Sequence, residues 1–384
     1  MRSSSLLLLA LLSLPALALA QEVEPTYGWT SDAPRAADLN EWVPEPRSAP
    51  YFENWDLWLW ADDGTFVALQ FLTSSFGFGF EGQGSARLLI VDADAFNTHN
   101  EQTEGVGWGD RGFDNDGDWD WTIEPDHIRV DWRDCYFVAH PDRIEVFMRG
   151  RRRQNWVEFT LTPEAPYLRP GDGEIAYGWD QHRTYTLQAM PRVRFEGRIN
   201  QKPDRDAPDA WRPVSGVGYV EHSRTNAFPH DIAREFLGFR ALRPDGLSIV
   251  IDNVTTPDAY GNTLIPWALV LLDGEVVFES FDVQVVVTDT RTENWGDTDY
   301  RVPFGYLIEA RSGADVLRVN VSNSELVSAD SFLNRVSALL RRVISAVMDP
   351  YDFDLSNDYD ASVTIGGHTA GVSGRGWTTF NATQ

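Results

Sequence analysis

The sequence predicts an all-β protein made of two antiparallel β-barrels in tandem, with one amphipathic helix near the C-terminus. Three observations predict this fold. Short apolar segments separated by turn signals run from Tyr51 onward, several of them alternate apolar and polar residues, and one arrangement of segments recurs about half a chain later. Few segments have a helical period, which favours barrels or sandwiches over an α/β enzyme.

The clearest alternation spans residues 192–199, Arg-Val-Arg-Phe-Glu-Gly-Arg-Ile. Because side chains alternate between the two faces of a strand, Val193, Phe195 and Ile199 are expected on one buried face. This is the pattern of a half-buried strand. Similar strands are predicted at 129–132, 144–148, 155–161, 248–252, 275–288 and 316–321.

Asp-Gly pairs between apolar runs predict tight hairpins, since glycine accepts the positive φ that such turns require. They occur at 63–64, 245–246 and 273–274. The first pair and its flanking runs, 55–60 and 65–72, have a counterpart in the second pair with 236–242 and 247–251. This repeat indicates two domains, 51–191 and 192–384, with the seam near Pro191.

The N-terminal segment has the pattern of a signal peptide. Arg2 precedes the apolar run 6–12, and Ala18-Leu19-Ala20 supplies small residues before Gln21. The run is short for an uncleaved membrane anchor, which is the alternative, and we expect no transmembrane segment in the mature chain. Residues 1–20 therefore predict export to a periplasmic or secreted location. Residues 21–50 are rich in proline and acidic residues, which predicts an extended tether or surface strap.

The predicted helix spans residues 331–348, where apolar residues recur at spacings of three and four. Asp330 can cap its start and Pro350 marks its end. Two interpretations are open. The helix either packs on the outside of a barrel, or forms a lid or membrane-docking face that carries Arg335, Arg341 and Arg342.

The composition excludes some partners. The formal net charge of -26 disfavours nucleic acid and anionic membrane surfaces. Cys135 is the only cysteine, so no intrachain disulfide forms and stability must come from burial. The sequence has no G-x-S-x-G, P-loop or H-E-x-x-H motif, and we expect no cofactor.

One acidic run is a candidate metal site. Asp114, Asp116, Asp118 and Asp120 have the close spacing of an oxygen-ligand calcium loop, with Gly117 at the turn. The order does not match a complete EF-hand, because no glutamate falls at the twelfth position. The run is therefore either a structural calcium site or an exposed, solvated loop.

A second group suggests acid–base chemistry. Gly216 and Gly218 precede Glu221 and His222, and His230 follows closely, so a carboxylate and an imidazole could act as general acid and base. Neighbours on a strand point to opposite faces, however, so Glu221 and His222 line one pocket only if the strand bulges. The alternative is that these groups are satisfied by hydrogen bonds where the domains meet.

Several short motifs, taken in order, connect the chain to a known family. They are Asp63-Gly64-Thr65-Phe66, Thr162-Pro163-Glu164-Ala165-Pro166, Pro191-Arg192-Val193, Pro229-His230, Thr255-Thr256-Pro257 and Tyr260-Gly261. In these and in its late helix, nearly all of the chain after about Tyr51 resembles the survival-factor family of paired lipocalin-like domains, within the hydroxyneurosporene synthase superfamily. The resemblance implies two lipocalin-like barrels that handle lipids or isoprenoids.

Two functions follow as hypotheses. The first is an exported carrier that holds a lipid or other apolar small molecule in a β-barrel cavity lined by aromatic residues such as Tyr219, Phe239 and Trp267. The second is an acid-catalysed hydratase, isomerase or cyclase acting on an isoprenoid-like substrate, with Glu221, His222 and His230 as catalytic candidates. What separates the two hypotheses is whether a carboxylate or an imidazole points into the cavity.

Overall fold

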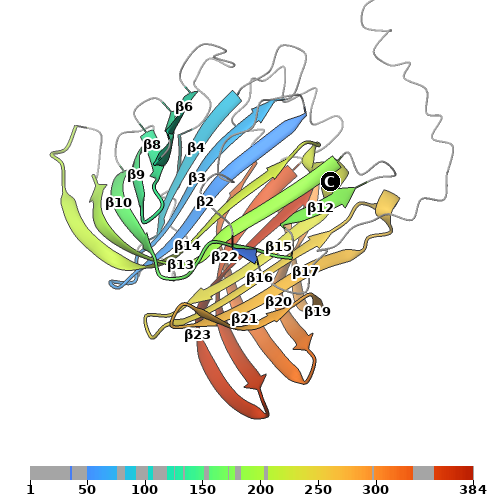
Figure 1. Cartoon of the computed structure of the whole chain (residues 1–384). Helices are drawn as coiled ribbons and strands as arrows, with labels where there is room; N and C mark the ends of the chain where they lie inside the picture. Colours follow the sequence, from blue (N-terminus) through green and yellow to red (C-terminus); the bar gives the residue numbers. More distant parts are fainter. Residues whose placement is uncertain are drawn as a thin grey trace, which may run out of the picture.

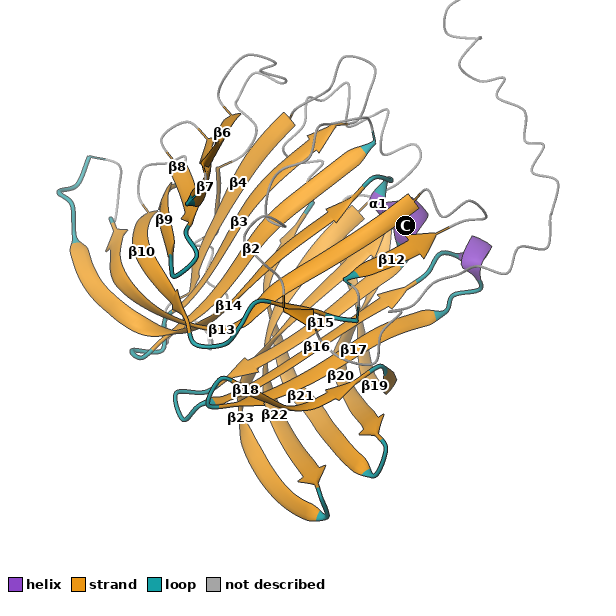
Figure 2. Cartoon of the chain, viewed as in Figure 1, coloured by secondary structure: helices purple, strands orange, loops and turns teal. Residues whose placement is uncertain are grey.

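The computed structural model is an all-β protein with two antiparallel sheets (Figures 1 and 2). It describes residues 35–36, 50–75, 83–91, 103–106, 119–124, 126–132, 135–150, 155–171, 173–177, 183–202, 206–295, 298–331 and 350–383. The helical elements within these ranges are α1 (Pro229–Ile232) and the 3-10 helix η3 (Asp258–Tyr260).

The first sheet uses the N-terminal part of the chain. Its strands follow the order β5-β4-β3-β2-β14-β13-β10-β9-β8-β7-β6, with β1, β11 and β12 attached at the side through β13. The bounds are β1 (Arg35–Ala36), β2 (Tyr51–Ala61), β3 (Phe66–Ser75), β4 (Gln83–Val91), β5 (Thr103–Val106), β6 (Trp119–Glu124), β7 (His127–Trp132), β8 (Cys135–Ala139), β9 (Ile144–Arg149), β10 (Asn155–Pro163), β11 (Leu168–Arg169), β12 (Glu174–Tyr177), β13 (Arg183–Gln201) and β14 (Trp211–Thr225).

The second sheet has the order β18-β17-β16-β15-β23-β22-β21-β20-β19. The bounds are β15 (Glu235–Leu242), β16 (Leu247–Thr255), β17 (Leu264–Leu272), β18 (Glu275–Ser280), β19 (Asp282–Trp295), β20 (Thr298–Ser312), β21 (Asp315–Asp330), β22 (Pro350–Ile365) and β23 (His368–Thr383).

One segment predicted as a single strand forms two strands in the structure. The segment 275–288 breaks at Phe281 into β18 and the start of β19, because Ser280 turns the chain: its Oγ accepts from Asp282 N and donates to Arg311 O. β18 then pairs with β17 and β19 with β20, at the two ends of the sheet. The other predicted strands are confirmed, as are the three Asp-Gly hairpins, whose glycines have φ between 80° and 94°.

Both sheets curve strongly (Figure 1), but their hydrogen-bonded paths are open. Among the described residues no ladder joins β18 to β19 or β5 to β6, although β17 approaches β19 and β18 approaches β20. The all-β prediction is confirmed. Within the described ranges, the observed hydrogen bonds do not close either sheet into a barrel, so the two tandem barrels stay a prediction.

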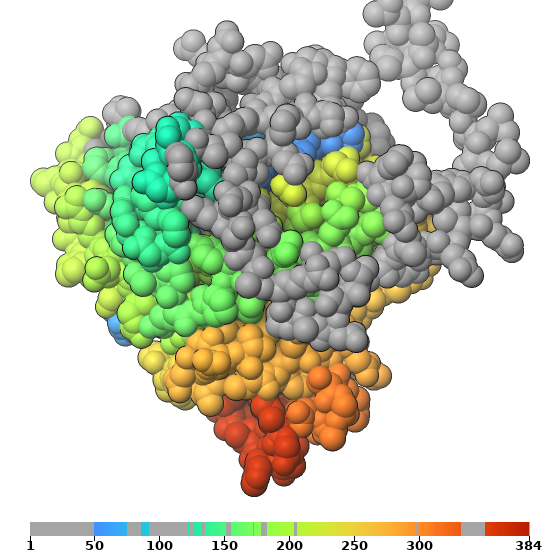
Figure 3. Space-filling model, viewed as in Figure 1, coloured from blue at the N-terminus to red at the C-terminus, as the bar shows by residue number. Residues whose placement is uncertain are grey.

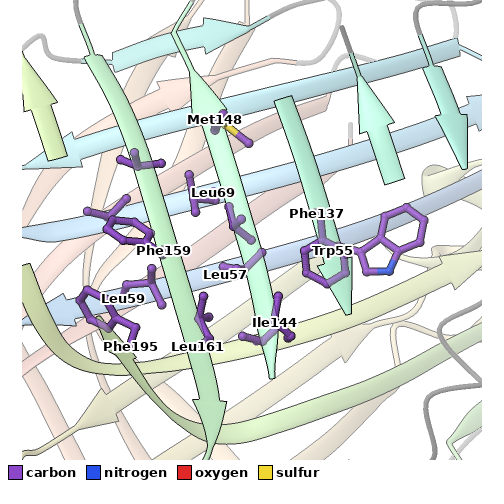
Figure 4. Packing of buried hydrophobic residues seen from close by; sticks show 14 of the residues in the cluster. Trp55, Leu57, Leu59, Leu69, Phe137, Ile144, Met148, Phe159, Leu161 and Phe195 are labelled. Atoms are coloured by element: carbon purple, nitrogen blue, oxygen red, sulfur yellow. The ribbon is translucent and has the colours of Figure 1, made fainter. Parts of the chain in front are cut away.

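Alternation along β2 gives the first sheet two different faces. Trp55, Leu57 and Leu59 are completely buried in the first core, where Trp55 lies beside Phe137 (Figure 4). The intervening Asp56, Trp58 and Trp60 face the second sheet. Val193, Phe195 and Ile199 lie together in the same first core, which confirms their predicted shared face.

The two sheets pack directly against each other, and the green surface of the first meets the orange surface of the second in Figure 3. Phe66 of the first sheet stacks on Trp377 of the second with ring centroids 3.8 Å apart. Arg192 extends from β13 of the first sheet and donates hydrogen bonds to the backbone carbonyl oxygens of Arg243 and Leu247 in the β15–β16 hairpin of the second sheet. Pairing changes from one sheet to the other after Thr225, whereas the seam predicted near Pro191 falls inside β13.

Several predicted segments fall outside the described residues. These are the signal peptide 1–20, the tether 21–50 apart from β1 and Pro50, and the helix 331–348 apart from Ser331. Their assignments remain predictions. No helix in the described ranges is long and apolar enough to cross a membrane.

Candidate functional site

A cavity of about 220 Å³ lies between the two sheets. Strands β2, β3 and β14 form one wall, and β15, β16, β22 and β23 form the opposite wall. Its apolar lining includes Phe52, Trp58, Leu72, Leu187, Ile232, Phe236, Val254 and Ile265. Its polar lining includes Asn54, Asp56, Gln70, Arg87, Glu221, Ser223, Arg224, Arg240, Asp252, Asn253, Asp352, Asp354 and Asn381. The cavity is therefore amphipathic.

The strand register brings two carboxyl groups together in the first wall. Asp56 of β2 is directly opposite Glu221 of β14. Gln70 Nε2 donates to Asp56 Oδ1 at 2.9 Å, and Tyr219 OH donates to Glu221 Oε2 at 2.9 Å. Both carboxyl groups face the cavity.

The two glycines before Glu221 allow this close approach of β14 to β2. A Cβ at Gly216 would lie 2.0 Å from the carbonyl oxygen of Trp60, and one at Gly218 would lie 2.4 Å from Leu59 Cδ2. A side chain at Gly216 would therefore displace the backbone of the neighbouring strand, whereas one at Gly218 would first displace the Leu59 side chain.

Arg240 connects the two walls. From β15 of the second sheet, its Nη2 donates to Glu221 Oε2 at 3.1 Å and to Asp252 Oδ1 at 2.7 Å, while Nη1 donates to Ile251 O at 2.8 Å. The guanidinium carbon lies 4.3 Å from the centroid of the Tyr219 ring. Arg240 is almost fully buried, so these are desolvated, charge-assisted contacts.

Burial dominates the electrostatics of the three acidic groups. It raises the pKa of Glu221 to about 7, although Arg240 partly opposes this shift. Burial also raises the pKa of Asp56 well above its ordinary value, and the charge of Glu221 adds to the increase. The pKa of Asp252 is raised by burial against the stabilising effect of Arg240. The cavity thus holds one carboxyl group, Glu221, whose pKa lies near neutral pH, and two more whose pKa values are raised by burial.

A second ion pair crosses between the sheets beside the cavity. Arg87 of β4 donates to Asp354 Oδ2 of β22 at 2.5 Å and to Ser328 Oγ at 2.9 Å. Trp377 Nε1 donates to the other carboxylate oxygen of Asp354 at 3.3 Å. Both charged groups are nearly inaccessible, so the pair fixes how this edge of the two sheets meets.

His222 lies on the opposite face of β14 from Glu221. In the first core its Nε2 is 2.7 Å from Glu53 Oε1, and its ring stacks on Trp55 at 4.9 Å. The paired register continues unbroken through both residues, so the strand does not bulge there and Glu221 and His222 do not line one pocket. His230 lies in α1 with its ring stacked on Phe228 and is not among the cavity-lining residues.

The three predicted ligand-binding aromatics lie in different places. Tyr219 adjoins the cavity through its bonds to Glu221 and Arg240. Phe239 packs in the second core against Tyr359, and Trp267 lies in the core between the sheets, where its Nε1 donates to Glu279. Phe239 and Trp267 are not among the described residues that line this cavity.

The calcium candidates Asp114, Asp116 and Asp118 lie outside the described residues, and Asp120 is described only as a backbone position in β6. Within the described ranges, no three His, Cys, Asp or Glu side chains are grouped closely enough to hold a metal ion.

Sequence reasoning missed Asp56, Arg240 and Asp252. Each is a charged residue inside an otherwise apolar strand: Trp-Asp-Leu, Phe-Arg-Ala and Ile-Asp-Asn. A charge at such a position is costly unless it is paired, so this pattern was the available signal. It does not reveal which strands supply the partners.

Comparison with known proteins gives a distant relative and a common fold. No family model matches the chain. The ceramide-binding protein SVF1 of Candida albicans is 24% identical over 204 residues, which cover 51% of this chain and 52% of that protein. The chain thus spans about half the length of this relative.

Among solved structures, CghA has a TM-score of 0.59 at 12% identity, with 93% of this chain and 98% of that chain covered. Kievitone hydratase from Nectria haematococca has a TM-score of 0.53 at 11% identity, with coverage of 88% and 90%. At these identities the likeness concerns the fold alone.

Proposed function

We propose that this protein binds an amphipathic lipid or similar small molecule in the cavity between its two sheets. The observation that carries the proposal is the division of that cavity into an apolar wall near α1 and a polar cluster around Arg240. Such a surface suits a ligand with one greasy part and one polar part.

The volume supports a particular mode of binding. Pockets for drug-sized ligands have volumes of roughly 300–1,000 Å³, so a cavity of about 220 Å³ suits a polar head group with the first part of a chain. The rest of a long chain would follow the apolar wall outward. Each buried methylene would contribute about 0.8 kcal/mol, which allows useful affinity from a short buried stretch.

The similarity to a ceramide-binding protein supports a lipid as the ligand. We further propose that the curved sheets are two lipocalin-like domains and that residues 1–20 direct export to a periplasmic or secreted location. N-terminal sequencing of the exported protein should then begin at Gln21. An intact Met1 on exported protein would contradict this.

Acid catalysis is the second candidate function. Glu221 faces the cavity with a pKa of about 7, so a proton donor is present where a ligand would lie. A hydratase, isomerase or cyclase could use it to protonate an isoprenoid-like double bond. The similarity in fold to a protein named a hydratase is compatible with this function.

A matched pair of variants tests the proposed site. Ser223 lines the cavity and Ser215 lies exposed on the same strand, so Ser223→Phe should fill the cavity while Ser215→Phe should not. We expect a fluorescent ceramide analogue to bind the native protein and Ser215→Phe at near one-to-one stoichiometry, and to bind Ser223→Phe at least tenfold more weakly. Equal binding by both variants would place the ligand elsewhere. If the lipid is recovered chemically altered, and Glu221→Gln abolishes this alteration, the result would favour the enzymatic function.

A further inference from the structure

The polar cluster of the cavity has more hydrogen-bond acceptors than it can satisfy. Four of its side-chain oxygens are buried and accept no hydrogen bond within the described structure: Asn54 Oδ1, Asp252 Oδ2, Asn253 Oδ1 and Asn381 Oδ1. Asn253 is only 3% exposed, and its amide nitrogen is equally unpartnered. Buried polar atoms are normally paired, so unpaired acceptors that line a cavity point to a ligand that supplies donors.

The charges of the cluster also favour a ligand that supplies hydrogen-bond donors. Asp56, Glu221, Asp252, Asp352 and Asp354 line the cavity against Arg87, Arg224 and Arg240. Two of these cations are already engaged, since Arg87 pairs with Asp354 and Arg240 pairs with both Glu221 and Asp252. The Nε atoms of Arg87 and Arg240 are buried donors without a partner, but both guanidinium groups already pair with carboxylates. Because five carboxyl groups line the cavity with three guanidinium groups, an anionic head group would meet a surplus of carboxyl groups.

The space between Asp56 and Glu221 is the expected position of a bound cation. They oppose each other across the β2–β14 ladder, where the Cβ atoms of paired residues are roughly 5 Å apart. Among the described residues, Gln70 is the side chain that donates a hydrogen bond to Asp56, and no Lys, Arg or His forms an ion pair with it. An ammonium group carries three N–H donors and one positive charge, which would satisfy both carboxyl groups and one neighbouring amide oxygen.

We propose that the cavity selects an amphipathic amine, with the protonated nitrogen held between Asp56 and Glu221 and the chain along the apolar wall. This inference rests on the proposed function, because it names the class of ligand for the same cavity. It predicts discrimination among head groups on one common chain. An ammonium binds best, a neutral alcohol or amide binds less well, and a carboxylate binds worst.

The test compares octadecylamine, N-acetyl octadecylamine, octadecanol and stearate in competition with a fluorescent lipid at pH 7.5. We expect the amine to bind at least tenfold more tightly than the amide or alcohol. In the double variant Asp56→Asn, Glu221→Gln this preference should fall to about one, with octadecanol affinity retained. Glu158→Gln, on the outer face of β10, is the control and should keep the native preference.

The outcomes separate the two proposals. Binding of the alcohol without preference for the amine overturns the amine inference and leaves lipid binding intact. An amine preference that survives the double variant also overturns it, because the nitrogen then lies elsewhere. If none of the four molecules competes, the proposed function itself fails.

Discussion

Asp56 and Glu221 lie directly opposite each other on β2 and β14, and both face the cavity between the sheets. Like charges at directly opposed positions destabilise a sheet, and burial increases the cost. The structure relieves the cost by raising the pKa of both groups, so the pair holds a proton that isolated carboxyl groups would lose. The cavity is thus a place where folding free energy depends on protonation.

The first prediction follows from the pKa of Glu221, which burial raises from 4.5 to about 7. The folded protein binds this proton more tightly than the unfolded chain, so its contribution is fully present below about pH 4.5 and is lost as the pH rises toward 7. We expect Glu221 to lower the free energy of unfolding by roughly 3 kcal/mol between pH 5 and 8. Urea titrations at several pH values measure this slope, which Glu221→Gln should reduce.

Glu279 provides the control for this measurement, because burial also raises its pKa to about 7 while its bond from Trp267 opposes the shift. It lies away from the cavity, on β18. Glu279→Gln should therefore remove the contribution of Glu279 to the pH dependence of the free energy of unfolding and leave the contribution of Glu221. A native slope that rises with pH over this range would contradict both assignments.

The second prediction concerns Asp56 alone. Asp56→Asn keeps an oxygen to accept from Gln70 and removes the charge that opposes Glu221, so we expect about 1–2 kcal/mol of stabilisation at pH 8 and little effect at pH 5. Asp63→Asn should have the opposite effect on the free energy of unfolding, a loss of stability at pH 8. Although partial burial opposes the shift, hydrogen bonds from Thr65 and attraction to Arg212 hold the pKa of Asp63 below its ordinary value. Denaturant midpoints for both variants at the two pH values provide the check.

Much of the fold was predictable because strand alternation and Asp-Gly turns are local signals. Val193 and Phe195 show this, since their buried face followed from period two alone. The site was less accessible to prediction, because it depends on which strands meet. Asp56 and Arg240 are distant in sequence, and nothing local to either residue shows that β14 places Glu221 beside both. The cavity also lies between sheets, whereas barrel reasoning placed a ligand inside one.

The third prediction concerns Arg240. Arg240→Met retains much of the side-chain volume but leaves Glu221 and Asp252 buried without their counterion, so we expect a loss of about 3–5 kcal/mol at pH 8. The loss should shrink at pH 5, where these carboxyl groups take up protons. Arg198→Met breaks an exposed pair with Glu158 and should cost less than about 1 kcal/mol. Similar losses in both variants would show that Arg240 is not the central cation of the cluster.

The fourth prediction tests the close approach of β14 to β2. Gly216→Ala would place a Cβ 2.0 Å from the backbone oxygen of Trp60, and backbone cannot yield as a flexible side chain can. We expect a loss above about 3 kcal/mol or failure to fold. Gly371→Ala is the matched strand control, because its Cβ would meet only Ala361 O at 3.9 Å. Its melting temperature should stay within a few degrees of the native value.

The last prediction uses Trp58 as a reporter of the cavity. Its ring lines the cavity, lies 5.5 Å from the ring of Tyr219 and has the Arg240 guanidinium 5.7 Å from its centroid. A ligand entering beside this cluster displaces water from the indole and alters its neighbouring charge, so lipid binding should change the intrinsic fluorescence. In Trp58→Phe most of that change should disappear while binding measured by native mass spectrometry persists. Trp211→Phe removes a tryptophan on the outer side of the first sheet, beside Arg198, and should leave the response unchanged. If both variants keep the full fluorescence response, the response does not come from Trp58, and the ligand binds away from this residue.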